Sequence, residues 1–210
     1  TLIFAIEMYE KVMDAYLAGL KKRLAAGQDV SNVASVASFF VSRVDTLVDK
    51  LLDARHSEGA RVAHLYGKAA NVNAKLAYAR FLDVFDESGG FADLAAQGAR
   101  VQRPLWASTS TKNPRYPDTL YVDPLVGPNT VNTLPPATIE AVLDHGRAEV
   151  TITDGLDDAQ ELVNALSQLG IEMKAVTDQL LAEGVDAFAK SFEQLMDNLA
   201  SKQEQLTART

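Results

Sequence analysis

Short apolar segments alternate with helical segments through residues 1–150, and this alternation leaves few possible folds. Four short segments are predicted to be strands, residues 1–4, 33–38, 104–108 and 130–134, and the second is small and apolar throughout. Apolar residues recur at helical spacing in residues 6–24, 44–52, 58–85, 119–125 and 135–145. Strands and helices in this order predict right-handed βαβ units and a parallel sheet. Residues 33–38 lack polar alternation, which favours a strand covered on both faces.

The number of strands suggests half of a barrel. Eight parallel strands close a (β/α)8 barrel, whereas this chain has four, and the first begins at residue 1 without an initiator methionine. An isolated half would leave two long sheet edges unpaired. We therefore expect residues 1–150 to form half of an α/β barrel whose other half lies outside this chain.

Residues 151–210 have a different pattern, with helical segments at 157–169 and 172–206 and no strand between them. An apolar stripe on the second segment comprises Val176, Leu180, Phe188, Phe192, Leu195 and Leu199. Such a stripe is typical of a helix that packs against another element. We expect these C-terminal helices to pack on the outside of the barrel or on a partner chain.

The composition excludes several classes of function. The net charge is −8, and the one basic run, Lys21-Lys22-Arg23, complements the dipole at the end of a predicted helix. We expect no nucleic-acid partner, because phosphate contacts need clustered Lys and Arg. We also expect no membrane span, because no apolar run approaches roughly 20 residues. The chain has no cysteine, which excludes a disulfide framework and fits the cytoplasm.

Polar side chains gather at the ends of the predicted strands, where parallel α/β folds bind their ligands. They are Thr1, Ser38, Arg43, Ser108, Ser110, Lys112, Asn113, Asn132 and Thr133, with Phe40 among them. Hydroxyl groups pair with sugar hydroxyls, and a guanidinium makes bidentate, charge-assisted contacts with a phosphate. The set therefore suits a polyhydroxylated, anionic ligand.

The motifs of other catalytic classes are absent. No HExxH, CxxC, GxSxG or Walker-type sequence occurs. His56, His64 and His145 lie in or beside predicted helices, which favours solvent-facing or capping roles, and the helical lysines are expected in solvent. Lys112 is the one lysine in a strand-end loop, and its polar neighbours do not provide the apolar burial that activates a Schiff-base lysine. A phosphate-binding role suits it better.

At these residues the chain resembles transaldolases. Thr1-Leu2-Ile3-Phe4 is similar to the end of their fifth barrel strand, Asn-x-Thr-Leu-x-Phe, with Thr1 at the threonine. Residues 38–43, Ser-Phe-Phe-Val-Ser-Arg, resemble Ser-Pro-Phe-Val-Gly-Arg at the end of strand six. Residues 106–108, Trp-Ala-Ser, resemble the Gly-Ala-Ser of strand seven. Residues 107–135 resemble the bacterial subgroup that also occurs fused to phosphoglucose isomerase.

The resemblance implies a fold and a reaction. The fold is the C-terminal half, about strands five to eight, of a (β/α)8 barrel. The reaction is a class I aldol transfer of the pentose phosphate pathway. A lysine on strand four forms a Schiff base with sedoheptulose 7-phosphate or fructose 6-phosphate and passes a dihydroxyacetone unit to an aldose phosphate. That lysine and the acidic residues of strands one and three lie upstream, so the chain alone is expected to be inactive. No metal or cofactor is implied, because the iminium is the electron sink.

The resemblance also implies roles for single residues. Thr1 would help to hold the catalytic water or the Schiff-base environment. Ser38 would contact the bound dihydroxyacetone, and Phe40 would form a wall of the site. Arg43 and Ser108 would bind phosphate.

The chain departs from the family pattern at several positions. Phe39 and Ser42 replace a proline and a glycine of the strand-six motif. The Ser-Phe-Arg of strand seven in other subgroups is here Ser-Thr-Ser-Thr-Lys, so Lys112, with Ser110 behind it, is the candidate for the second phosphate contact.

Two alternative functions stay open. The first is fructose-6-phosphate aldolase activity on the same scaffold. Relatives with that activity tend to carry tyrosine at the position of Phe40, and we favour transfer because phenylalanine activates water less. The second is a non-enzymatic helical interaction module that uses the acidic C-terminal helices as its surface. The phosphate-binding cluster at the strand ends argues against it.

Overall fold

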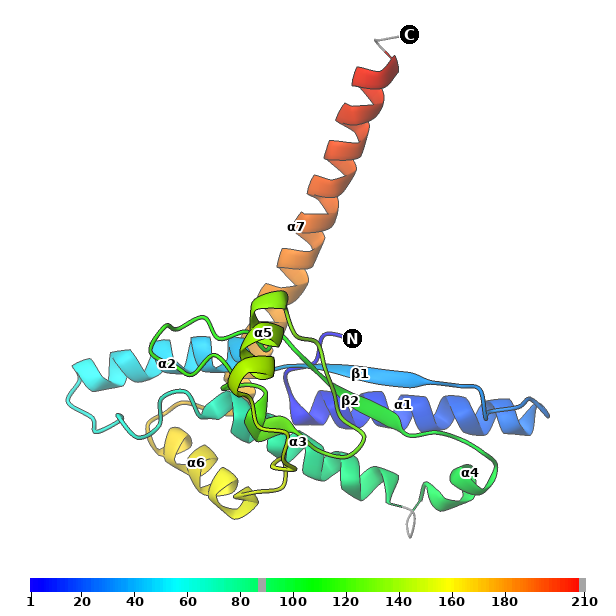
Figure 1. Ribbon diagram of the computed structural model, residues 1–210, viewed down its shortest axis with the longest axis horizontal. Coiled ribbons are helices and arrows are strands. Elements are labelled where there is room, and N and C mark those ends of the chain that lie inside the picture. Colours follow the sequence, from blue (N-terminus) through cyan, green and yellow to red (C-terminus); the bar gives the residue numbers. More distant parts are fainter. Residues whose placement is uncertain (87–89, 208–210) are drawn as a thin grey trace.

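The computed structural model describes residues 1–86 and 90–207. Its elements are α1 (Ile6–Ala25), β1 (Ser35–Phe40), α2 (Ser42–Ser57), α3 (Ala69–Phe85), α4 (Ala92–Ala96), β2 (Gln102–Ala107), η1 (Asp123–Leu125), β3 (Val131–Asn132), α5 (Pro136–His145), α6 (Leu156–Gln168) and α7 (Met173–Thr207). Strands are interspersed with helices as far as β3, and only helices follow (Figure 1). The predicted α/β class is therefore confirmed, and α6 and α7 lie within one residue of their predicted bounds.

The three strands form one parallel sheet in the order β1-β2-β3. Ser38 lies beside Leu105 in the register, and Phe40 lies beside Ala107. The N-terminal segment extends the sheet beyond β1: the Ile3 N–H donates to the Ser38 carbonyl at 3.2 Å, and the Ile3 carbonyl accepts from Phe40 at 2.8 Å. The four predicted strand segments are thus neighbours that run parallel, which brings their carboxyl ends to one edge.

Helices cover one face of this sheet. Ala37 and Phe39 are fully buried there, and the Phe39 ring packs edge-on against Tyr9 of α1 and Trp106 of β2 at 5.9 and 6.0 Å between centroids. The side chains of the other face are less covered, and Val36 is 45% exposed. The expectation that residues 33–38 would be covered on both faces is therefore wrong for this chain, because Val36 on the second face stays nearly half exposed. In a closed barrel that face would be the interior.

The main difference from the predicted elements lies between β1 and α3. The predicted helix 58–85 is confirmed only from Ala69, whereas residues 58–68 form turns and irregular chain. Gly59 and Gly67 have φ angles of +92° and +66°, which glycine adopts without steric cost and which interrupt a helix. The preceding helix, α2, is correspondingly longer than the predicted 44–52. The predicted helix 119–125 is reduced to the single 3-10 turn of η1.

The two C-terminal helices differ in how they are placed. The helix α6 packs against α3, whereas α7 begins against α2 and then extends away from the rest of the chain (Figure 1). Val176 and Leu180 are buried at the start of α7. Farther along the helix, each large apolar side chain of the predicted stripe is more than half exposed: Phe188, Phe192, Leu195 and Leu199. In residues 1–86 and 90–207, no helix combines the length and the hydropathy that crossing a membrane requires.

Candidate functional site

The strand ends bring Thr1 next to Ser38. The Thr1 hydroxyl accepts a hydrogen bond from the Ser38 backbone N–H at 2.7 Å and donates to the Ser38 carbonyl oxygen at 3.4 Å. Thr1 is exposed, and Ser38 is half-buried on the open face of the sheet. Two residues that are 37 positions apart in the sequence therefore meet at the same edge of the sheet.

Phe40 and Arg43 form the second part of the site. The strand β1 extends to Phe40, two residues beyond the predicted end at residue 38, and α2 begins at Ser42, two residues before the predicted start. Val41 alone makes the turn, and its N–H donates to a carbonyl at the end of β2 at 2.9 Å. Arg43 consequently lies in the first turn of a helix, with its guanidinium carbon 5.8 Å from the centre of the Phe40 ring.

The Arg43 guanidinium is open to a ligand. The side chain is exposed and has no hydrogen bond or ion pair with any residue in the described part of the chain. It lines a cavity of about 320 Å³ between α2 and α7, together with Lys50 and Glu183. A guanidinium in this state has all five N–H donors available for an anion.

The segment that follows β2, residues 108–122, begins with Ser108 and is called here the β2 loop. Ser108 has a φ of +56°, a region that non-glycine residues seldom adopt. Its hydroxyl lies 3.0 Å from the hydroxyl of Ser42, and its carbonyl accepts from the Ser42 N–H at 3.0 Å. The serine that replaces a glycine of the family pattern therefore fixes the start of the β2 loop to the first residue of α2.

Ser110 and Lys112 follow in the β2 loop, and the surroundings of Lys112 do not favour a phosphate. Ser110 is half-buried and Lys112 is exposed. Lys112 lines a cavity of about 280 Å³ that also has Lys50 and three carboxylates on its wall, those of Asp45, Asp49 and Asp53. Three carboxylates beside two ammonium groups repel a phosphate at this place. Arg43 is therefore better situated than Lys112 to bind one.

Asp45 and Asp49 are residues that the sequence analysis missed. Asp45 is 1% exposed; its Oδ1 accepts from the Ala70 N–H at 2.7 Å, and its Oδ2 accepts from the Tyr121 hydroxyl at 3.0 Å. Burial raises the pKa of Asp45 to about 7, although the Ala70 hydrogen bond acts in the opposite direction. The sequence did contain a signal for this pair: Asp45 and Asp49 are four residues apart in a predicted helix, and this spacing places two side chains on one face.

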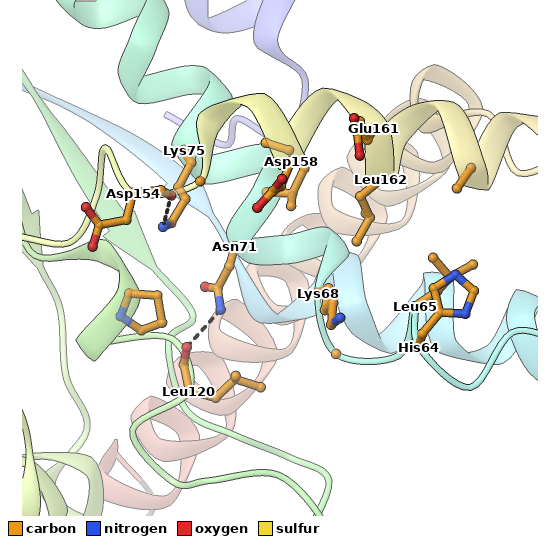
Figure 2. Close-up of a pocket in the computed structure, with 16 residues that line it drawn as sticks. His64, Leu65, Lys68, Asn71, Lys75, Leu120, Asp154, Asp158, Glu161 and Leu162 are labelled. Atoms are coloured by element: carbon orange, nitrogen blue, oxygen red, sulfur yellow. Dashed lines mark hydrogen bonds between the residues drawn. The ribbon is translucent and has the colours of Figure 1, made fainter.

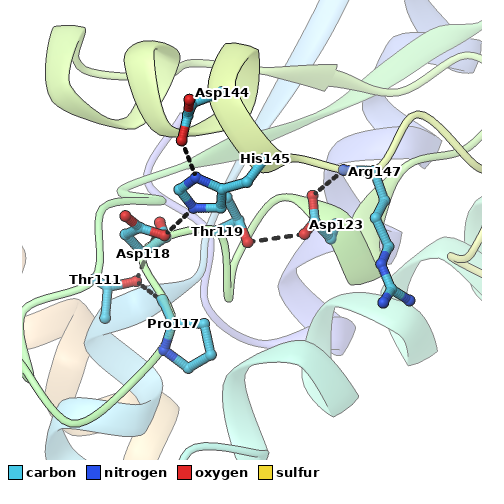
Figure 3. Close-up of polar contacts among 8 residues, drawn as sticks. All are labelled: Thr111, Pro117, Asp118, Thr119, Asp123, Asp144, His145 and Arg147. Atoms are coloured by element: carbon cyan, nitrogen blue, oxygen red, sulfur yellow. Dashed lines mark hydrogen bonds and ion pairs between the residues drawn. The ribbon is translucent and has the colours of Figure 1, made fainter.

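The helix α5 holds the β2 loop from another side (Figure 3). His145, at the end of α5, contacts Asp118 through Nε2 at 2.8 Å and Asp144 through Nδ1 at 3.0 Å. The hydrogen bonds with Asp118 and then with Asp144 raise the pKa of His145, so the ring keeps its proton to higher pH. His145 is exposed, as predicted, but it links α5 to the β2 loop. At the turn of this loop, the Thr111 hydroxyl donates to the Pro117 carbonyl at 2.9 Å.

A larger cavity, of about 630 Å³, lies between α3 and α6 (Figure 2). Lys75 lines it and donates to the carbonyl oxygens of Thr151 and Asp154 at 3.0 and 2.7 Å. Burial lowers the pKa of Lys75. The expectation that helical lysines lie in solvent is therefore wrong for Lys75, because α6 and the segment before it cover the side chain. Its ammonium is held in the outer helical layer and not at the strand ends.

A parallel α/β sheet with its polar groups gathered at the carboxyl ends of the strands is the architecture of barrel enzymes. Among the described residues, no three His, Asp or Glu side chains are arranged to hold a metal ion. Residues 1–199 match the family described as Transaldolase/Fructose-6-phosphate aldolase. The chain belongs to this family, and the resemblance seen in its motifs is confirmed.

Individual relatives are similar along nearly the whole chain. The chain is 51% identical over 211 residues to a transaldolase from Thermobifida fusca, which covers 100% of this chain and 56% of the relative. It is 52% identical over 199 residues to a transaldolase from Mycolicibacterium paratuberculosis, which covers 94% of this chain and 52% of the relative. It is 46% identical over 211 residues to transaldolase 2 from Nostoc, and this alignment covers 96% of this chain and 55% of the relative. The chain thus spans about half the length of the curated relatives it matches.

Proposed function

We propose that this chain is the C-terminal half of a transaldolase of the pentose phosphate pathway that acts in the cytoplasm. The complete enzyme, meaning this chain together with the other half of the barrel, would move a dihydroxyacetone unit from sedoheptulose 7-phosphate or fructose 6-phosphate to an aldose phosphate. The observation that carries the proposal is the unpaired Arg43 guanidinium at the strand ends, beside the exposed hydroxyl edge of Thr1 and Ser38.

The reaction that this arrangement supports uses a lysine outside this chain. Its amine adds to the ketose carbonyl and expels water, which leaves an iminium. An acidic residue outside this chain takes the proton of the C4 hydroxyl, the bond between C3 and C4 breaks, its electron pair moves toward the iminium, and the aldose phosphate departs. The retained carbon attacks the aldehyde of the acceptor, whose oxygen takes the proton back, and water releases the product and the lysine.

The residues of this chain bind and orient in that scheme. The hydroxyls of Thr1 and Ser38 hold the water and the hydroxyl groups of the dihydroxyacetone unit. Phe40 forms an apolar wall that limits access of bulk water to the iminium. Arg43 binds the phosphate in a bidentate manner, and Ser108 adds a hydroxyl donor.

Fructose-6-phosphate aldolase activity is the second candidate, since the family includes both activities. Phe40 favours transfer, because a phenyl ring has no hydroxyl that polarises water next to the intermediate. The exposed stripe of α7 would be the surface of a non-enzymatic interaction module. An interaction module would not explain why polar side chains gather at the ends of the strands, so we favour an enzyme.

The test is a coupled assay of erythrose 4-phosphate formation from sedoheptulose 7-phosphate and glyceraldehyde 3-phosphate. The complete enzyme should turn over both substrates, and this chain alone should not. Free glyceraldehyde 3-phosphate released from fructose 6-phosphate without an acceptor would identify the aldolase instead. A complete enzyme with neither activity would refute both enzymatic assignments.

A further inference from the structure

Three carboxylates follow one another along one face of α2, and each accepts a hydrogen bond from a tyrosine. Asp45, Asp49 and Asp53 are four residues apart, which aligns them on the helix. The Tyr121 hydroxyl donates to Asp45 at 3.0 Å, and the Tyr116 hydroxyl donates to Asp49 at 2.6 Å. The Tyr66 hydroxyl donates to Asp53 at 2.7 Å. The three pairs have the same chemistry but connect α2 to different parts of the chain.

The first two pairs reach the β2 loop, and the third does not. Tyr116 and Tyr121 belong to this loop, whereas Tyr66 lies in the segment between α2 and α3. Asp45 and Asp49 also accept backbone N–H groups: Ala70, in the first turn of α3, donates to Asp45 at 2.7 Å, and Gly67, in the segment before α3, donates to Asp49 at 3.0 Å. Each of these two carboxylates therefore joins three parts of the chain at one point.

The helix α2 thus holds the β2 loop at both ends. Ser42 fixes the start of the loop through its contact with Ser108, and Asp45, one turn later, fixes the end through Tyr121. Arg43 lies between these two attachment points in the sequence of α2. A helix is stiff, so Ser42, Arg43 and Asp45 keep fixed positions relative to one another. The contacts of Ser42 and Asp45 with the β2 loop therefore set how far the loop lies from Arg43.

We propose that Asp45 and Asp49 are positioning residues of the sugar-phosphate site, which hold the β2 loop in register with Arg43 through Tyr121 and Tyr116. The inference rests on the proposed function for the identity of the ligand. Neither carboxylate touches the substrate in this scheme. Both carboxyl groups lie in the cavity that Lys50, Asp53 and Lys112 also line. The tyrosine hydroxyls and the two backbone N–H groups donate hydrogen bonds to their oxygens, which offsets the cost of removing these oxygens from water.

The experiment removes one hydroxyl at a time in the complete enzyme, which leaves each aromatic ring in place. Tyr121→Phe and Tyr116→Phe test the loop attachments. Tyr66→Phe is the matched control, because it deletes the same kind of tyrosine–aspartate bond on the same helix without touching the β2 loop. Two measurements are made on each variant: steady-state kinetics with fructose 6-phosphate and with unphosphorylated dihydroxyacetone as donors, and hydrogen–deuterium exchange of residues 108–122.

Tyr121→Phe and Tyr116→Phe should raise the KM for fructose 6-phosphate roughly three- to tenfold with little change in kcat, because a displaced loop weakens phosphate binding. The KM for dihydroxyacetone should stay unchanged. Amide exchange in residues 108–122 should accelerate in both variants. Tyr66→Phe should leave both kinetics and loop exchange as in the unsubstituted enzyme.

Three results would overturn the proposal. One is a loss with Tyr66→Phe as large as with Tyr121→Phe, which would mean that α2 is generally destabilised. Another is an equal loss with both donors, which would separate the loop from phosphate binding. The third is unchanged exchange of residues 108–122 in an active Tyr121→Phe enzyme. If the unsubstituted complete enzyme lacks transfer activity, it is the proposed function that fails, and accelerated exchange would then still identify the loop attachment.

Discussion

The guanidinium of Arg43 lies over the ring of Phe40, with 5.8 Å between its central carbon and the ring centroid. This contact joins the last residue of β1 to the first turn of α2. A cation over an aromatic face is attracted by the ring quadrupole, and the attraction leaves the N–H donors free at the edge of the guanidinium. Phe40 therefore orients Arg43 without consuming the donors that a phosphate needs.

Arg43→Ala in the complete enzyme should raise the KM for fructose 6-phosphate by roughly ten- to a hundredfold. Hydrogen bonds to charged groups contribute about 1.5–3 kcal/mol each, and 1.4 kcal/mol is about a factor of ten. Arg43→Lys should recover part of the loss, since an ammonium is a point charge without the bidentate fork. Steady-state kinetics with dihydroxyacetone as donor are the control. Equal weakening of both donors would make Arg43 a structural residue.

Lys112→Ala should have the same kind of effect on KM as Arg43→Ala but a smaller one. The carboxylates of Asp45, Asp49 and Asp53 share its cavity and offset its charge toward a phosphate. Lys68→Ala is a suitable control, because Lys68 is exposed at the start of α3 and lines the cavity between α3 and α6 instead. A loss for Lys112→Ala that exceeds the loss for Arg43→Ala would reverse the assignment of the main phosphate contact.

Phe40→Tyr should shift the complete enzyme from transfer toward aldol cleavage. The added hydroxyl would lie on the open face of the sheet, next to the edge formed by Thr1 and Ser38, where it polarises a water beside the intermediate. The measurement is the ratio of free dihydroxyacetone to sedoheptulose 7-phosphate, formed from fructose 6-phosphate with erythrose 4-phosphate as acceptor. If both activities fall together and their ratio stays constant, Phe40 is only a packing residue.

The sequence predicted the sheet and the C-terminal helices because their signals are local. Residues 33–38 and 104–108 are continuous apolar runs, and the observed strands β1 and β2 lie within two residues of them. The segment 58–68 was wrongly assigned to a helix, since its apolar spacing is helical but Gly59 and Gly67 adopt positive φ. That conformation depends on how the two flanking helices pack, which a single sequence does not reveal.

The candidate site was predictable in part for the same reason. Ser38, Phe40 and Ser108 follow directly from the strand ends and the family motifs. The tyrosine contacts of Asp45 and Asp49 were not predictable, because Tyr121 and Asp45 are 76 residues apart and meet only through the fold. Lys75 was misjudged because its burial depends on α6, which lies more than 80 residues farther along the chain.

No lysine of this chain should form a Schiff base. Borohydride reduction of the complete enzyme in the presence of fructose 6-phosphate should modify a lysine outside residues 1–210, and peptide mass spectrometry would locate it. Lys75 is the informative control because burial lowers its pKa, a property that Schiff-base lysines share. Its ammonium is nevertheless bound to two carbonyl oxygens in the outer layer. An adduct on Lys75 or Lys112 would overturn the assignment.

Asp45 should make the complete enzyme less stable as the pH rises toward neutrality. Its folded pKa of about 7 lies above the ordinary aspartate value of 3.8, so folding takes up a proton between these values, and the stability falls as the pH rises from about 4 to about 7. Asp45→Asn carries no charge there. Between pH 5 and pH 8, urea unfolding should show the stability of the unsubstituted enzyme falling relative to Asp45→Asn by about 2–3 kcal/mol. A difference that is constant with pH would contradict the raised pKa.

The apolar stripe of α7 should be covered by the other half of the barrel in the complete enzyme. Phe188 and Phe192 are 59% and 63% exposed, and Leu195 and Leu199 continue the same face. Burying a phenylalanine side chain contributes about 1.5–3 kcal/mol. Replacing both phenylalanines by aspartate should therefore lower the free energy of unfolding by roughly 3–6 kcal/mol, measured in urea.

The matched control for this change is the double substitution Gln194→Asp and Ser201→Asp, which adds the same charge to the opposite face of α7. It should leave the stability nearly unchanged, because both side chains are exposed. Sedimentation separates the two possible covering surfaces. If the phenylalanine variant unfolds more easily at an unchanged oligomeric state, the other half of the barrel covers the stripe. If it dissociates into smaller species of unchanged stability, a second copy covers the stripe and the prediction is wrong.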